Sequence, residues 1–119
     1  MKLFKYINKD NRPWGLYYVI HDQSDYKIKR IEVNPNEKLS YQYHNKRSEA
    51  WTIISGTGDV IIDDKVYKVK PGVTLTIPKL SKHRIHNTSN EVLVFIEVQT
   101  GDYFGEDDIV RIEDQYNRK

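Results

Sequence analysis

The stretch that decides the fold is QYHNKRSEAWTIISG, residues 42–56, in which three side chains able to bind a metal lead into an apolar run. Gln42 and His44 are two positions apart, so on an extended chain their side chains point to the same face. Glu49 follows after a short polar turn and then alternates with Trp51 along the next segment. If the two segments pair as strands, an amide oxygen, an imidazole nitrogen and a carboxylate converge inside one sheet.

A second segment, residues 72–87 (GVTLTIPKLSKHRIHN), offers a further ligand, His83. On an extended chain His83 shares a face with the apolar Ile85, whereas His86 lies on the opposite face. We therefore expect His83 to face the core and His86 to face solvent or a partner. His21, which ends an apolar run beside an aspartate, has no partner motif and is interpreted as structural.

Each candidate ligand also has an ordinary explanation: a hydrogen-bonded histidine, a solvated glutamate at a strand end, a polar glutamine. Their spacing favours a shared site, because a buried Glu and a buried His are costly unless they are paired or bound to a cation. The mixed nitrogen and oxygen set suits a divalent metal, with Zn as the first candidate and Mn, Fe, Co or Ni as the others. The predicted metal ligands are Gln42, His44, Glu49 and His83.

The rest of the chain consists of short runs of β-forming residues separated by Gly, Pro, Asn and Asp, without a 3.6-residue period. This pattern predicts an all-β sandwich or barrel. Strands are expected at residues 14–21, 26–33, 38–44, 49–55, 59–63, 66–70, 73–78, 83–87 and 91–100, with a short apolar segment near the end.

At 119 residues the chain is expected to form one domain, residues 1–119, in which residues 1–12 are an arm or a short edge strand. It contains no cysteine, which excludes a disulfide framework and thiolate ligands. No segment is apolar enough for a signal peptide or a membrane span, so a cytoplasmic protein without a membrane partner is expected.

A formal net charge of +2 is too small, and too scattered, to indicate nucleic acid as a partner. The densest basic spot holds Lys27, Lys29 and Arg30. It is either a solvated strand face or a phosphate-binding corner.

The two segments that carry the candidate ligands resemble the cupin superfamily. Its first motif has a Gly, a His-x-His, a Glu after three or four residues and a Gly six residues later; its second has a Gly, five residues, Pro-x-Gly, two residues, His, three residues and Asn. In the first motif His44, Glu49 and Gly56 match, and Gln42 stands where the first His is common; in the second, Gly72, Pro78, His83 and Asn87 match, with Leu80 in place of a Gly.

A narrower resemblance covers nearly the whole chain from Arg12 to Arg118. Together the sequences RPWG (12–15), YKIKRIEV, QxH (42–44), RxExW (47–51), SGT (55–57), IEVQ (96–99) and GEDDIVR (105–111) are similar to the type II mannose-6-phosphate isomerase domain. That domain is usually the C-terminal part of bifunctional enzymes with mannose-1-phosphate guanylyltransferase, and Gln is usual there at the first ligand position. The resemblance implies an isomerase domain standing alone.

The resemblance implies a cupin double-stranded β-helix, or jelly-roll, barrel and a metal-dependent interconversion of mannose 6-phosphate and fructose 6-phosphate through an enediol. The implied partner is a sugar phosphate, and a homodimer is also expected, with the segment before Pro13 as a candidate exchanged strand. The candidate catalytic residues are Arg111, for phosphate or enediolate charge unless it forms a surface salt bridge with the acidic run, and Glu97 as a base beside the alternative of a metal-bound hydroxide. Lys46 and Arg30 are weaker candidates for the role of Arg111.

The sequence departs from this family at four further positions. The family usually has His where Asn45, Lys46 and Ala50 stand, and Gly where Asn36 stands. Loss of this His-rich rim favours one alternative, a cupin that binds a sugar without turnover. A second alternative is an isomerase or epimerase of a nucleotide-linked sugar, although the His–Asp pair expected for it is not found.

Overall fold

The structure, a computed structural model, describes residues 4–114, and within that range it is entirely β with no helix. It therefore contains no helix, among the residues it describes, with the length and apolarity to cross a bilayer. The all-β expectation is confirmed. The strands are β1 (Asn8–Arg12), β2 (Gly15–Asp22), β3 (Tyr26–Val33), β4 (Tyr41–Tyr43), β5 (Arg47–Ser55), β6 (Gly58–Ile62), β7 (Lys65–Val69), β8 (Thr74–Ile77), β9 (His83–His86), β10 (Leu93–Gly101) and β11 (Val110–Glu113).

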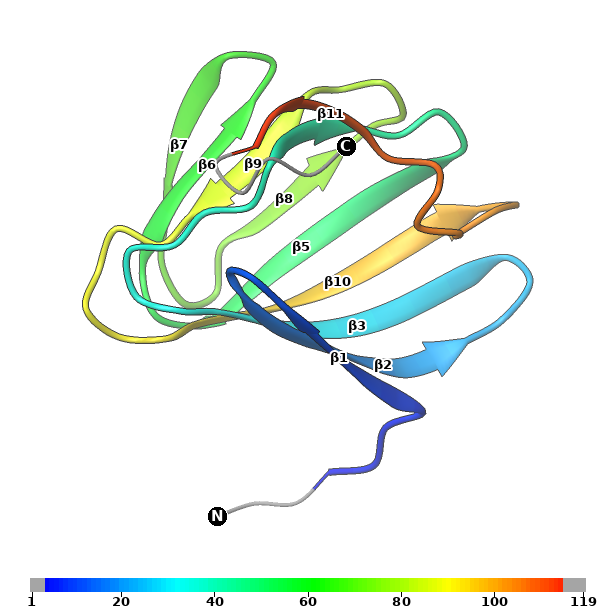
Figure 1. The fold of residues 1–119 in the computed structure, drawn as a ribbon, viewed down its shortest axis with the longest axis horizontal. Helices are drawn as coiled ribbons and strands as arrows, with labels where there is room; N and C mark the ends of the chain where they lie inside the picture. The colour runs from blue at the N-terminus through cyan, green and yellow to red at the C-terminus, as the bar shows by residue number, and fades with distance from the viewer. Residues whose placement is uncertain (1–3, 115–119) are drawn as a thin grey trace.

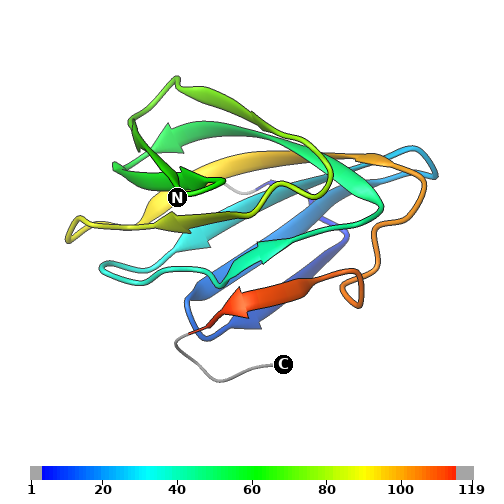
Figure 2. The same ribbon diagram turned by 90° about the horizontal axis from the view of Figure 1, so that it is seen from above.

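The strands form two antiparallel sheets that pack face to face. A six-stranded sheet has the order β1-β2-β3-β10-β5-β8, and a five-stranded sheet has the order β11-β4-β9-β6-β7. Figure 1 shows β6 and β7 (green) at one end of the molecule and β1 and β2 (blue) at the other. In Figure 2 the strands of both layers run in roughly the same direction, and β11 lies beside its partner β4.

One expected pairing is wrong. The strands around His44 and Glu49 were expected to pair within one sheet, but β4 pairs with β9 and β11, whereas β5 pairs with β10 and β8. The short connection between Tyr43 and Arg47 crosses from one sheet to the other. β4 is also shorter than the strand expected at residues 38–44. His44 and Glu49 therefore meet across the interior between the sheets.

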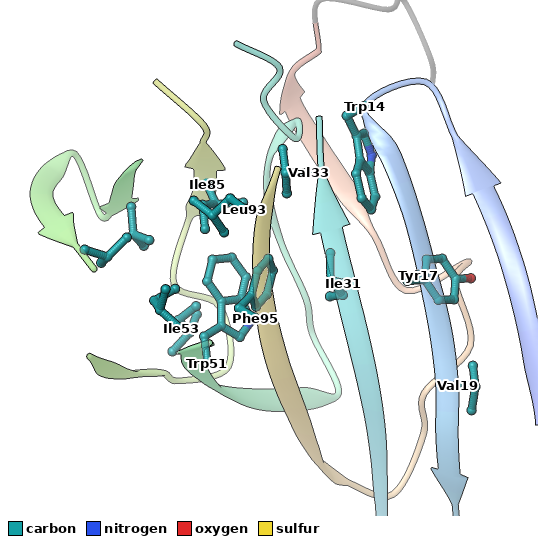
Figure 3. Close-up of a cluster of buried hydrophobic side chains, with 13 residues drawn as sticks. Trp14, Tyr17, Val19, Ile31, Val33, Trp51, Ile53, Ile85, Leu93 and Phe95 are labelled. Carbon is teal, nitrogen blue, oxygen red and sulfur yellow. The ribbon is translucent and has the colours of Figure 1, made fainter. Parts of the chain in front are cut away.

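The core fills the space between the sheets, because alternate residues of each strand point inward. Figure 3 shows two parts of it: Trp51 and Phe95 with their neighbours at one side, and Trp14 and Tyr17 on β2 or just before it at the other. The Trp51 and Phe95 rings have centroids 4.7 Å apart. The core residues are Trp14, Tyr17, Val19, Ile31, Val33, Trp51, Ile53, Val60, Val69, Ile77, Ile85, Leu93 and Phe95.

Two departures from the family pattern fall on positive backbone φ angles. Asn36 has φ 63° and Leu80 has φ 70°, where the resemblance calls for glycine. Glycine adopts this left-handed conformation without the steric cost that a Cβ brings. Asn tolerates this conformation, so the steric cost falls mainly on Leu80.

β1 forms the edge of the six-stranded sheet and pairs with β2 of its own chain, within the segment expected to be an arm or edge strand. Residues 1–3 of that segment lie outside the described residues. Exchange of this strand between copies stays a prediction.

Candidate metal centre and the adjoining cleft

Three buried side chains from both sheets meet in the interior. His44 follows β4, His83 begins β9 and Glu49 lies on β5; one ligand atom from each fits within a group of atoms at most 4.8 Å apart. The Nε2 atoms of His44 and His83 lie 3.2 Å and 3.5 Å from the two oxygens of Glu49. Each residue is at most 3% exposed. As expected, His83 faces inward. Ile85, on the same face of the strand, has no exposed surface.

The hydrogen bonds of the two imidazoles suit metal ligation. His44 Nδ1 lies 2.9 Å from the carbonyl oxygen of Asp108, and His83 Nδ1 lies 2.9 Å from that of Ser81. A carbonyl accepts only, so each Nδ1 carries a proton, and in the neutral imidazole the Nε2 atom keeps the lone pair that a metal needs. The Nε2 atom of His83 is buried and has no hydrogen-bond partner among the described residues. In their neutral forms both imidazoles turn an Nε2 lone pair towards the Glu49 carboxylate. A cation bound between the three side chains would satisfy all of them.

The protonation states that these surroundings favour are those of a metal site. Burial would raise the pKa of Glu49, but its hydrogen bond with His44 and the charges around it hold that pKa well below the usual range. Burial lowers the pKa of His83. Metals bind ionised carboxylates and neutral imidazoles, so near neutral pH the group needs no proton release at these two residues.

Gln42, the fourth predicted ligand, lies next to the group, but its amide nitrogen rather than its oxygen faces the group. Its Nε2 is 3.4 Å from His44 Nε2, while its Oε1 accepts a hydrogen bond of 2.5 Å from the buried Ser40. To present oxygen to a metal, the amide must rotate by half a turn, after which its NH₂ would face the Ser40 hydroxyl, which can also accept.

Arg47 and Trp51 hold Glu49 in place. Arg47 donates from Nε to Glu49 Oε2 at 2.8 Å, and a second guanidinium nitrogen lies 3.2 Å from His44 Nε2. Trp51 donates from its indole nitrogen to Glu49 Oε1 at 3.1 Å and to Glu97 Oε2 at 3.0 Å. The indole thus links the carboxylate of the metal group to a second buried carboxyl group.

That second carboxyl group belongs to Glu97 on β10, the candidate base. It is 4% exposed and also accepts from Gln99 Nε2 at 2.6 Å. Burial and the neighbouring Glu49 charge raise the pKa of Glu97 to about 7. A carboxyl group with a pKa near neutrality can both take up and release a proton.

A cleft adjoins the metal group and is lined mainly by charged and aromatic side chains. Gln42, Arg47 and Glu97 connect it to the group. Of its lining residues, four are basic and two acidic. The complete lining is Arg12, Trp14, Tyr17, Lys29, Ile31, Leu39, Gln42, Arg47, Glu97, Glu106 and Arg111.

The basic spot on β3 splits between the two faces of its sheet. Lys29 is 3% exposed and lines the cleft, so a solvated strand face is the wrong interpretation for this residue. Arg30 points the other way, is paired with Glu32 and does not line the cleft. Alternation carried the signal: in YKIKRIEV, Lys29 shares a face with Ile31 and Val33.

The remaining predicted residues divide between the cleft and the surface. Arg111, on β11 opposite Gln42, lines the cleft. Lys46 does not: it is exposed, and its amine lies 4.7 Å from the centre of the Tyr103 ring. Asn45 is exposed too, and Ala50 lies on the outward-facing side of β5. The three positions where the family usually has His therefore do not line this cleft.

Sequence reasoning missed Arg47 and Glu106 as site residues. Arg47 alternates with Glu49 and Trp51, which signals an inward side chain. Glu106 lies in the β10–β11 connection, where no periodicity applies, and only its place in GEDDIVR could have singled it out.

Comparison with known proteins gives consistent relatives. Residues 2–114 match a protein family described as Mannose-6-phosphate isomerase C-terminal. The chain is 43% identical over 107 residues to Alginate biosynthesis protein AlgA of Pseudomonas aeruginosa and 44% identical to Xanthan biosynthesis protein XanB of Xanthomonas campestris. It is 41% identical to Mannose-1-phosphate guanylyltransferase ManC of Salmonella typhimurium. The match covers 90% of this chain in each case but only 22% or 23% of the relative.

Solved structures confirm the fold. An uncharacterised protein with a double-stranded β-helix domain from Klebsiella pneumoniae superposes with a TM-score of 0.77 at 18% identity, over 95% of this chain and 98% of that one. A cupin-2 domain from Rhodospirillum rubrum gives 0.67 at 22% identity, over 78% and 67%. The fold is thus the expected cupin double-stranded β-helix, and by its sequence match the chain belongs to the family of mannose-6-phosphate isomerase C-terminal domains.

Proposed function

We propose that this chain is a metal-dependent aldose–ketose isomerase that interconverts mannose 6-phosphate and fructose 6-phosphate. The observation that carries the proposal is geometric: a buried His44–Glu49–His83 group adjoins a cleft with four basic side chains and a buried carboxyl group. The family description supplies the substrate.

The reaction moves a proton between C2 and C1 of the sugar. It needs a base beside the carbonyl carbon, stabilisation of the developing oxyanion and a cation for the phosphate. Bound to His44, Glu49 and His83, a divalent metal, with Zn as the first candidate, would act as a Lewis acid on the substrate oxygens. Glu97 would take the proton from one carbon and return it to the other, held in place by Trp51 and Gln99.

A coupled assay on protein purified without a metal-chelate column tests the proposal, together with elemental analysis of the same sample. We expect mannose-6-phosphate isomerisation that a chelator abolishes and Zn, Mn or Co restores. A background rate with metal bound would contradict it and leave the two alternatives: a sugar-binding module without turnover, or an enzyme of nucleotide-linked sugars.

Replacement of Glu97 by Gln tests the role of its carboxyl group. Gln keeps the shape and can accept from the Trp51 indole, but it cannot exchange a proton. We expect kcat to fall by about 10²- to 10⁴-fold, while the bound metal per chain stays unchanged. The matched control is Glu32→Gln, on the outer face of the same sheet. An active Glu97→Gln variant would remove Glu97 from the mechanism.

A further inference from the structure

The carboxylate of Glu106 reaches into the basic part of the cleft. Its Oε1 lies 3.5 Å from Lys29 Nζ, and its Oε2 lies 3.3 Å from a terminal nitrogen of Arg47. Arg47 thereby lies between two carboxylates, because its Nε donates to Glu49 of the metal group. Glu106 consequently occupies a position one guanidinium group away from the metal group.

The two cations that contact Glu106 are buried, whereas the Glu106 carboxylate is accessible to solvent. The side chains of Lys29 and Arg47 are 4% and 3% exposed, but that of Glu106 is 37% exposed. The Lys29 amine also lies 4.1 Å from the centre of the Tyr17 ring, whose hydroxyl accepts from Arg12 at 3.1 Å. The buried cations belong to strands of the sheet, and Glu106 belongs to a turn between β10 and β11.

Buried cations are costly without an anion beside them. In the free protein Glu106 supplies that anion for Lys29 and Arg47, and these two cations lower its pKa although burial opposes them, so it is ionised at neutral pH. A phosphate group carries more charge and more acceptor oxygens than a carboxylate, and arginine binds it through a fork of donors. It is the stronger partner for the same cations.

We propose that Lys29, Arg47 and Arg12 form a phosphate subsite, which Glu106 occupies in the free protein and leaves when a phosphate enters. The identity of the sugar that carries the phosphate rests on the proposed function; binding of the anion itself does not. The exchange selects phosphorylated sugars, because a neutral sugar has no charge with which to replace Glu106.

Calorimetric titration of the metal-free chain with inorganic phosphate at pH 7 tests this subsite. Glu106→Gln removes the competing charge, and we expect it to bind phosphate about tenfold more tightly. Lys29→Met keeps a long apolar side chain but removes the amine, and we expect it to bind about tenfold more weakly. The matched control is Glu113→Gln, whose carboxylate pairs with Arg84 at 3.0 Å on the other sheet; its affinity should equal that of the unmodified chain.

Phosphate binding that is unchanged or weaker in Glu106→Gln, or unchanged in Lys29→Met, overturns the subsite. If Lys29→Met fails to fold by circular dichroism, Arg12→Gln takes its place, since the Arg12 side chain is 29% exposed and its ion pair with Asp10 is also partly exposed. Failure of the isomerase proposal is a separate result: mannose 6-phosphate would not turn over with metal bound, while the three affinities would still differ as stated.

Discussion

Glu106 is bound to two buried cations, and this determines how its contribution to stability depends on pH. Burial would raise the pKa of its carboxyl group, but Lys29 and Arg47 hold that pKa below the ordinary 4.5. The folded chain therefore binds this proton less readily than the unfolded chain. The stabilisation is complete above about pH 4.5 and is lost as the pH falls through the lower folded-state pKa.

We therefore expect the free energy of unfolding to be lower in Glu106→Gln than in the unmodified chain at pH 7, with the difference closing below pH 4. Urea unfolding of the two proteins between pH 3 and 7 measures it. Glu32→Gln provides the comparison for an ion pair on the outer face of the sheet. A difference that stays constant across this range would show that ionisation of Glu106 does not stabilise the fold.

Leu80 is a residue whose backbone and side chain conflict. It has φ 70°, its side chain is 61% exposed, and its N–H donates to the carbonyl of His44 at 2.9 Å. Left-handed backbone costs a non-glycine residue roughly 1–2 kcal/mol. We expect Leu80→Gly to raise the free energy of unfolding by about 1 kcal/mol, because glycine keeps the hydrogen bond and removes the strain, less the entropy of a freer unfolded chain.

Urea unfolding measures this gain, with Lys79→Gly as the control at a neighbouring position without a positive φ. The control should lose stability, since there glycine brings only entropy. If both variants lose stability equally, backbone strain at Leu80 does not lower the free energy of unfolding.

At the scale of elements, the β10–β11 connection holds the metal group in place. The Asp108 carboxylate accepts from the backbone N–H groups of Asn45 at 3.1 Å and Lys46 at 2.9 Å. The backbone carbonyl of Asp108 accepts from His44 Nδ1. The turn that follows β4 is therefore fixed to a segment about sixty residues away. This contact orients the imidazole, as the outer partners of metal ligands generally do.

We expect Asp108→Asn to lower the free energy of unfolding by about 1–3 kcal/mol, because the new NH₂ group replaces an acceptor that a backbone N–H needs. Affinity for Zn²⁺ should fall as well, through His44. Asp107→Asn is the matched control: Asp107 is exposed and accepts a hydrogen bond from the Tyr103 hydroxyl rather than from the turn that follows β4. Equal stability of the two variants would contradict this role of Asp108.

Strand positions could be read from the sequence, but strand partners could not. The alternation in YKIKRIEV and HRIHN correctly gave β3 and the inward face of His83, because apolar periodicity reports which side of a strand is covered. It does not report which strand lies alongside. Gln42 lies opposite His83, about forty residues later, while the adjacent Glu49 belongs to the other sheet.

For the whole molecule, the consequence is that the ligands join the two sheets. His44 and His83 belong to the five-stranded sheet and Glu49 to the six-stranded one. His44 and Glu49 could be predicted as candidate ligands from their short spacing, and His83 from the inward face of its segment together with the motif resemblance. The cationic cleft could be predicted only in part, since Arg12, Lys29, Arg47 and Glu106 meet through tertiary contacts between distant segments.

A metal that bridges the sheets should stabilise the whole fold. An ion that binds only the folded chain adds about 2.7 kcal/mol at a free concentration 100 times its Kd. For a chain of 119 residues this corresponds to a rise in Tm of about 10 °C. We expect Zn²⁺ added to the metal-stripped protein to raise Tm by this amount in differential scanning calorimetry, independently of any substrate.

His83→Ala should abolish the rise, because it removes the one ligand that links β9 to Glu49. His86→Ala is the matched control, since His86 lies on the same strand but outside the group. Its Tm without Zn²⁺ is the baseline for loss of an imidazole from β9, and Zn²⁺ should raise that Tm as much as it raises the Tm of the unmodified chain. An equal gain in His83→Ala would mean that Zn²⁺ acts elsewhere on the chain, because the buried group would have lost one of its three candidate ligands.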